Sequence, residues 1–135
     1  MHTPDISNLS HPLALYRNHL EFYGYRIEEE EGYILAYHTR RPGLLVRLVD
    51  DRGVLVSIVS GFAEDLGRPE MLEYLNELNR GLVFLKAYVD EDNSLVMESF
   101  FEGEYDRTRF SILMDNIQGD FDLLMSHPQT EDYLE

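Results

Sequence analysis

Histidine side chains are the first candidates for chemistry, because they bind metals and transfer protons near neutral pH. The sequence has five histidines, at these positions: His2, His11, His19, His38 and His127. None follows another at the i, i+4 spacing that places two ligands on one helix face, and no HExxH arrangement occurs. The chain also has no cysteine, which removes thiolate metal sites, thiol catalysis and disulfides together. We therefore expect no metal site and no cofactor.

The acidic segment DEDNSLVMESFF, which begins at Asp90, has the outline of a calcium-binding loop. Asp90, Asp92 and Ser94 occupy the first, third and fifth positions of such a loop. The sixth position requires a glycine and is Leu95, and the twelfth requires a bidentate glutamate and is Phe101. We interpret the segment as a solvated hairpin turn, since Asp, Asn and Ser form turns by local hydrogen bonding.

No catalytic motif stands out in the sequence. A GxSxG nucleophile motif is absent, and Ser57 and Ser60 have no histidine close to them in sequence. The glycines are spread singly through turns and form no phosphate-binding loop. Glu28–Glu31 is a charge run expected to form a solvated strand edge, although one inward carboxylate acting as a general base is an alternative. We expect no catalytic residues.

The elements that would position these side chains follow from hydrophobic spacing. Apolar residues at i, i+3, i+7 and i+10 predict a helix over Pro12–Tyr23, and Gly24 is placed to end it. Strand-like runs then follow, joined by short turn sequences: YRIEEE, GYILAYH, LLVRLV and VLVSIV. Because short connections join consecutive strands as antiparallel hairpins, we expect a meander.

After the meander the hydrophobic period changes from 2 to 3.6 residues, which predicts a helix over Pro69–Arg80. Asn76 and Asn79 lie near its end, where we expect both side chains to hydrogen-bond the free backbone groups of the helix exit. Two further runs, Leu82–Val89 and Leu95–Phe101, predict a hairpin around the acidic turn.

A last, long helix is predicted to start at an Asp106 cap, and its apolar stripe extends to Leu124. Gly119 lies inside this stripe, which predicts either a bend or a close backbone contact. The resulting order is helix, strand meander, helix, hairpin, helix. It predicts an α+β fold with a mostly antiparallel sheet. At 135 residues we expect one domain, with a core over 12–125 and loose tails at 1–10 and 128–135.

The charge of the chain restricts its partners. The formal net charge is −15, and Lys86 is the only lysine. Nucleic acid and anionic membrane surfaces are therefore poor partners, because both require a concentrated basic surface. The polar N-terminus lacks the pattern of a secretory signal, and the apolar runs are far shorter than the roughly 18 residues of a membrane helix. We expect a cytoplasmic protein.

Aromatic residues give the most specific indication of binding. The chain has nine tyrosines and seven phenylalanines, and many of them fall on both faces of predicted strands. A sheet with helices on one face leaves its other face to solvent or to a partner, and aromatic side chains there favour an interface. The residues selected as candidates for protein binding or dimerisation are Leu72, Leu75, Phe84, Tyr88 and Phe100.

The block YLNELNRGLVFLKAYVDEDNSLVMESFFEGEYDRTRF resembles the most recognisable part of the YbjN family. That family shows an N-x-x-N ending a helix, matched here by Asn76 and Asn79, followed by an apolar strand, an acidic turn and a returning strand. The upstream elements also fall in the family's order, so that the resemblance covers about Pro12–Leu124.

The resemblance implies a fold similar to that of type III secretion chaperones, which are small, acidic, dimeric α+β proteins. It implies a non-enzymatic regulator of the sensory-transduction type, a homodimer that binds a client protein segment through an apolar face. Two alternatives stay open: a dedicated type III effector chaperone, and a small-molecule binder or enzyme with an α+β pocket.

Overall fold

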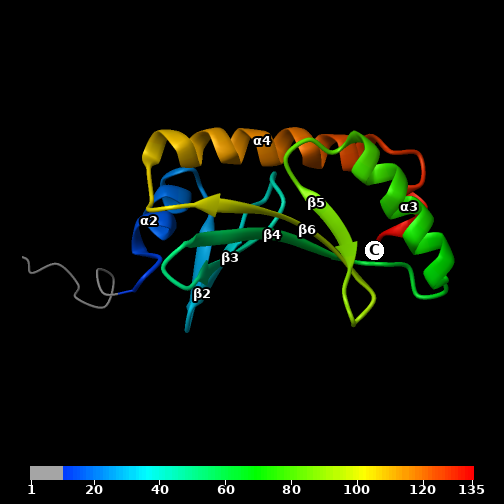
Figure 1. The fold of residues 1–135 in the computed structure, drawn as a ribbon, viewed down its shortest axis with the longest axis horizontal. Helices are drawn as coiled ribbons and strands as arrows, with labels where there is room; N and C mark the ends of the chain where they lie inside the picture. Colours follow the sequence, from blue (N-terminus) through cyan, green and yellow to red (C-terminus); the bar gives the residue numbers. More distant parts are fainter. Residues whose placement is uncertain (1–10) are drawn as a thin grey trace, which may run out of the picture.

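The fold is an antiparallel sheet with helices packed along one face. The computed structural model describes residues 11–135, and the predicted tail at 1–10 lies outside the described residues. The long helix α4 runs along the length of the molecule, with α2 near one end and α3 near the other (Figure 1). The elements in chain order are α2 (Ala14–Phe22), β1 (Arg26–Glu30), β2 (Tyr33–Tyr37), β3 (Leu44–Val49), β4 (Gly53–Gly61), α3 (Arg68–Gly81), β5 (Lys86–Val89), β6 (Ser94–Glu102), α4 (Arg107–Ser126) and α5 (Thr130–Tyr133).

The sheet has six strands in the order β1-β2-β3-β4-β6-β5, and every neighbouring pair is antiparallel. The first four strands form the predicted meander, and β6 pairs with β4 while β5 takes the outer edge. The α+β prediction is therefore confirmed. The largest difference in boundaries is at β5, which begins at Lys86 and not at Leu82.

Strand alternation separates the two faces of the sheet. In β4, Val54, Val56 and Ile58 point toward the helices and are at most 7% exposed. Their neighbours on the helix side of β6 are Phe101 and Met97, which complete the same core layer. A strand places successive side chains on opposite faces, so the residues between these point away from the helices.

The start of α4 is fixed as predicted, because the Asp106 carboxylate accepts a hydrogen bond from the Arg109 backbone N–H at 2.8 Å. The helix continues without interruption through Gly119. A Cβ added at Gly119 would have no atom within 4 Å, so the predicted close backbone contact at this glycine is wrong.

The acidic turn between β5 and β6 is stabilised by the carboxylate of its first residue, Asp90. Asp90 Oδ1 accepts hydrogen bonds from the backbone N–H groups of Asp92 and Ser94, at 3.0 and 2.8 Å. Asn93 adopts a left-handed conformation with φ 59°. These features are those of a hydrogen-bonded hairpin turn, as the sequence predicts.

Two side chains from helices hold β5 at the edge of the sheet. Asn79 donates from Nδ2 to the Ala87 carbonyl at 2.9 Å and accepts at Oδ1 from the Ala87 N–H at 3.0 Å. The prediction that Asn79 bonds its own helix exit is therefore wrong, because its amide pairs with a strand backbone. Asn76 is exposed and makes no side-chain hydrogen bond among the described residues.

Asp120 of α4 is the second of these anchors. Its carboxylate is 3% exposed and accepts three backbone N–H groups, from Val83 at 3.2 Å and from Phe84 and Leu85 at 2.8 Å. Leu85 then enters the core at 5% exposed. This carboxylate fixes the path of the chain into β5, because N–H bonds to a charged acceptor are about twice as strong as neutral ones.

The segment 128–135 is part of the fold, which corrects the prediction of a loose tail there. Thr130, at the start of α5, donates from Oγ1 to the Leu124 carbonyl at 2.6 Å and accepts from the Tyr74 hydroxyl. Leu134 forms a β-bridge with Phe62. The periodicity of this acidic segment is too short to indicate a packed helix, and its anchors come from distant residues.

Candidate protein-binding face

Among residues 11–135, no helix covers one face of the sheet, and this face carries mostly apolar side chains. We call this surface the open face and define it by the apolar and aromatic side chains that the pairing register places opposite the helices. They are Tyr33, Leu35, Tyr37, Leu45, Val49, Leu55, Val59, Tyr88, Val96 and Phe100. The open face therefore draws on five of the strands, β2 to β6.

Several of these side chains are well exposed to solvent. The exposed fractions are 39% for Tyr37, 54% for Val59, 40% for Tyr88 and 45% for Phe100. These values are high for large apolar side chains within a regular sheet, since such residues are mostly buried. Gathered on one surface, they form the kind of apolar patch that marks an interaction site.

A buried carboxylate lies among them. Glu98 is 6% exposed, accepts the Ser57 hydroxyl at 3.2 Å and pairs with the Lys86 ammonium at 3.4 Å. Lys86, the only lysine of the chain, thus lies on this face. A charge so buried is stabilised when both ionic and hydrogen-bond partners are present.

Cations lie over tyrosine rings near two edges of the open face. The Arg26 guanidinium is 4.5 Å from the centroid of Tyr37, and the Lys86 ammonium is 5.9 Å from that of Tyr88. Burial raises the pKa of Tyr88 above its ordinary value of 10.0, and the neighbouring Glu98 carboxylate raises it further. Tyr88 therefore stays a neutral hydroxyl beside the Glu98 carboxylate.

The closest approach to a catalytic arrangement lies on the helix side of the molecule. His19 Nδ1 is 2.7 Å from the Tyr105 hydroxyl, and Nε2 is 3.4 Å from the Ser111 hydroxyl. The ring is 7% exposed and packs edge-on against Phe110. Burial lowers the pKa of His19, so the neutral ring acts here as a hydrogen-bonded link between α2, Tyr105 and α4.

Comparison with known proteins identifies the family of the chain. The model of the YbjN family, described as "Putative bacterial sensory transduction regulator", matches residues 14–118. The chain belongs to the YbjN family. A similar solved structure is described as "Crystal structure of YbjN, a putative transcription regulator from E. coli". The likeness has a TM-score of 0.72 at 15% sequence identity, and it covers 91% of this chain and 95% of that chain.

The likeness to the YbjN structure shows the fold of this chain, and the family match adds a regulatory or binding role in general terms. No curated protein matches the chain. Among residues 11–135, no helix combines the length and the apolar character needed to cross a membrane. Over the same range, no three His, Asp or Glu side chains are grouped so as to hold a metal ion.

The five candidate residues selected from the sequence do not share one surface of this YbjN-family protein. Tyr88 and Phe100 lie on the open face. Leu72 is 50% exposed, on α3. Leu75 is 5% exposed within the core and is no candidate for contact with a partner. Phe84 is 47% exposed but precedes β5, so its predicted place on the strand beside Tyr88 is wrong.

Sequence reasoning also missed two residues of the open face. Val59 is its most exposed apolar side chain, yet a valine in the run VLVSIV is expected in a sheet core. The alternation from Val54 onward does place Val59 opposite the core residues, so this signal was present once the covered face was known. The burial of Glu98 depends on the pairing of β6 with both β4 and β5, which no local pattern reports.

Proposed function

We propose that this YbjN-family protein is a regulator that acts by binding a segment of another protein on the open face. The observation that carries the proposal is the exposure of Val59, Phe100, Tyr88 and Tyr37 on one helix-free surface. Burying such side chains against a partner contributes about 25 cal/mol per Å² of apolar area removed from water.

The polar groups of the open face favour binding to a specific partner over non-specific hydrophobic association. The Glu98 carboxylate and the two cation–tyrosine pairs fix charges at defined positions among apolar side chains. Protein interfaces combine aromatic anchors with a small number of oriented polar groups in this way. The high negative charge of the rest of the chain keeps such a surface soluble.

The homodimer that we expect from the sequence belongs to the same proposal. Two copies, each with a net charge of −15, repel one another over most of their surfaces. The open face carries charges of both signs, among them Arg26, Arg47 and Lys86 beside Glu28 and Glu98. Because of this mixture, a second copy meets less repulsion at the open face than it would at a uniformly acidic surface.

Site-specific photo-crosslinking in living bacteria tests the proposal. A photoreactive phenylalanine analogue is placed at Val59 or at Phe100, and separately at Ile112 of α4, which is 54% exposed outside the open face. A fourth variant carries it at Leu72, the exposed candidate on α3. We expect discrete crosslinked products at Val59 and Phe100 and none at Ile112.

The mass of the products identifies the occupant of the open face. A band at twice the mass of the chain indicates a second copy, and a band at another discrete mass indicates a different protein partner. Crosslinks confined to Leu72 or Ile112 would move the binding surface to the helices and contradict the proposal. Diffuse products of equal strength at all four positions would also contradict it, because they indicate an unspecific surface.

A further inference from the structure

We propose that a cavity between the sheet and the C-terminal segment binds a small apolar molecule that carries a positive charge, a hydrophobic amine. The cavity lies on the helix side of the sheet, opposite the open face, and has a volume of about 480 Å³. Cavities of roughly 300 to 1,000 Å³ are typical of small-molecule sites.

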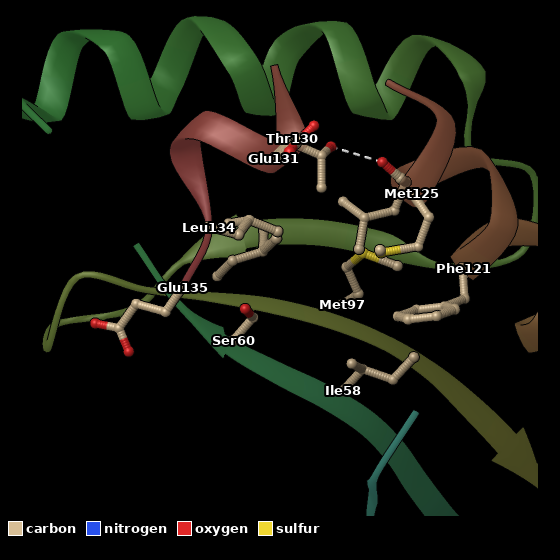
Figure 2. Close-up of a pocket in the computed structure, with 11 residues that line it drawn as sticks. Ile58, Ser60, Met97, Phe121, Met125, Thr130, Glu131, Leu134 and Glu135 are labelled. Atoms are coloured by element: carbon tan, nitrogen blue, oxygen red, sulfur yellow. Dashed lines mark hydrogen bonds between the residues drawn. The ribbon is translucent and has the colours of Figure 1, made fainter. Parts of the chain in front are cut away.

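The walls of the cavity come from three parts of the fold (Figure 2). Strands β4 and β6 form its floor, the second half of α4 forms one wall, and α5 with the residues after it forms another. In Figure 2, Met97, Met125 and Phe121 gather on one side of this space, and Leu134 lies opposite them. A ligand inside would therefore contact apolar groups on several sides.

The lining suits an apolar body of variable shape. Met97 is 1% exposed in the floor and Met125 is 59% exposed at the surface, so flexible thioether side chains lie both inside and at the mouth. Methionine adapts to irregular apolar ligands better than branched residues do. Ser60 adds one hydroxyl, which points up from β4 into the space below Leu134 (Figure 2).

The charged residues that line the cavity determine which sign of charge a ligand can carry. They are Glu131 and Glu135, and no lysine, arginine or histidine joins them. The Glu135 carboxylate lies at the outer side of the site, turned away from the apolar side chains (Figure 2). An amphiphile can thus place its hydrocarbon inside and its cation at this acidic rim, whereas an anionic head group would be repelled by both carboxylates.

The cavity is preformed, because its C-terminal wall is bonded to the body of the fold. The Glu135 N–H donates to the Gly61 carbonyl at 3.0 Å, and the Ala63 N–H donates to the Tyr133 carbonyl at 2.8 Å. With Thr130 anchored at the other end of α5, the wall is held on both sides of the cavity. Binding of a ligand therefore does not include the free-energy cost of ordering this wall.

This inference goes beyond the proposed function and is independent of it, since the cavity and the open face lie on opposite sides of the sheet. A titration of the full chain with three eight-carbon probes tests it: octylammonium, octanol and octanoate. The signals followed are the methionine methyl groups by NMR. Met97 and Met125 line the cavity, whereas Met71 and Met114 do not.

We expect octylammonium to shift the methyl signals of Met97 and Met125 and to leave those of Met71 and Met114 unchanged. Its affinity should exceed that of octanoate by about two- to fivefold, the size of an exposed ionic contact. Changing Glu131→Gln together with Glu135→Gln should remove most of this preference while leaving octanol binding unchanged.

Filling the cavity provides the decisive variant. Ser60→Leu should weaken octylammonium binding by at least about tenfold, and Thr108→Leu, at an exposed position of α4 outside the cavity, should not. Met125→Trp fills the mouth from the surface and serves if Ser60→Leu does not fold. Octanoate binding as tightly as octylammonium, unchanged binding in the filled variants, or no shift at Met97 would each overturn the proposal.

Discussion

Phe100 and Phe101 are neighbours in β6, yet they lie on opposite faces of the sheet and in opposite environments. Phe101 is 5% exposed and packs edge-on against the rings of Tyr16 from α2 and Phe110 from α4. Phe100 is 45% exposed on the open face. The covered face thus uses its aromatic residues for stability, whereas the open face leaves comparable residues available for a partner.

Replacing each phenylalanine with alanine should give the largest difference in stability loss between the two faces. Phe101→Ala removes a buried ring from the aromatic cluster and should lower the free energy of unfolding by about 3–5 kcal/mol. Phe100→Ala should lower it by less than about 1 kcal/mol, because the ring is already half in water. Urea denaturation followed by circular dichroism measures both. Equal losses would remove the distinction between the faces.

The next largest effect should come from the anchor that positions β5, and with it Tyr88, for the open face. Asp120→Ala leaves three backbone N–H groups without their acceptor and should cost about 2–3 kcal/mol. Asp122→Ala is the matched control on the exposed side of the same helix and should cost less than about 0.5 kcal/mol. Urea midpoints that fall equally in both variants would refute the role of Asp120.

The two asparagines of the N-x-x-N pattern offer a smaller and sharper contrast. Asn79→Ala removes both hydrogen bonds to Ala87 at the edge strand and should cost about 1–2 kcal/mol. Asn76→Ala should be nearly neutral, since the Asn76 side chain makes no hydrogen bond among the described residues. Hydrogen exchange at the Ala87 amide should accelerate in the first variant alone. Matching exchange rates in the two variants would show that Asn79 does not hold the strand.

The smallest expected effect is a pH dependence on the covered side. Burial lowers the pKa of His19 in the folded protein below 6.5, so the unfolded chain binds the proton more readily. The contribution of His19 is therefore present above pH 6.5 and is lost as the pH falls through and below that value. The decline in stability from pH 7.5 to 5.5 should be shallower in His19→Gln than in the wild type. A parallel decline would show that His19 is not the group responsible.

Local patterns in the sequence predict most of this fold. The alternation in VLVSIV and the short turns between strands predict the meander, because strand periodicity and hairpin length are local properties. The Asp106 cap is likewise a contact over three residues. By contrast, Asn79 bonds to a strand eight residues on, and Asp120 binds N–H groups more than thirty residues before it. Contacts of this kind depend on how the elements pack.

The candidate binding surface was predicted only in part for the same reason. Tyr88 and Phe100 follow from strand alternation, but Leu75 shares its helical stripe with residues that the structure buries against the sheet. Phe84 carries a strand-like sequence, yet its N–H is bound by Asp120 before β5 begins. The C-terminal wall of the cavity was expected to be loose, because its anchors Tyr74 and Phe62 are far away in the sequence.

The central claim is that the open face serves binding and not folding. Its most direct test places the photoreactive residue at Val59 and compares two further substitutions, Phe100→Asp on the open face and Ile112→Asp on α4. We predict that Phe100→Asp abolishes the crosslinked product while the free energy of unfolding falls by only about 1–2 kcal/mol, so that the variant stays folded, and that Ile112→Asp leaves the product intact. An undiminished product in Phe100→Asp would contradict the account.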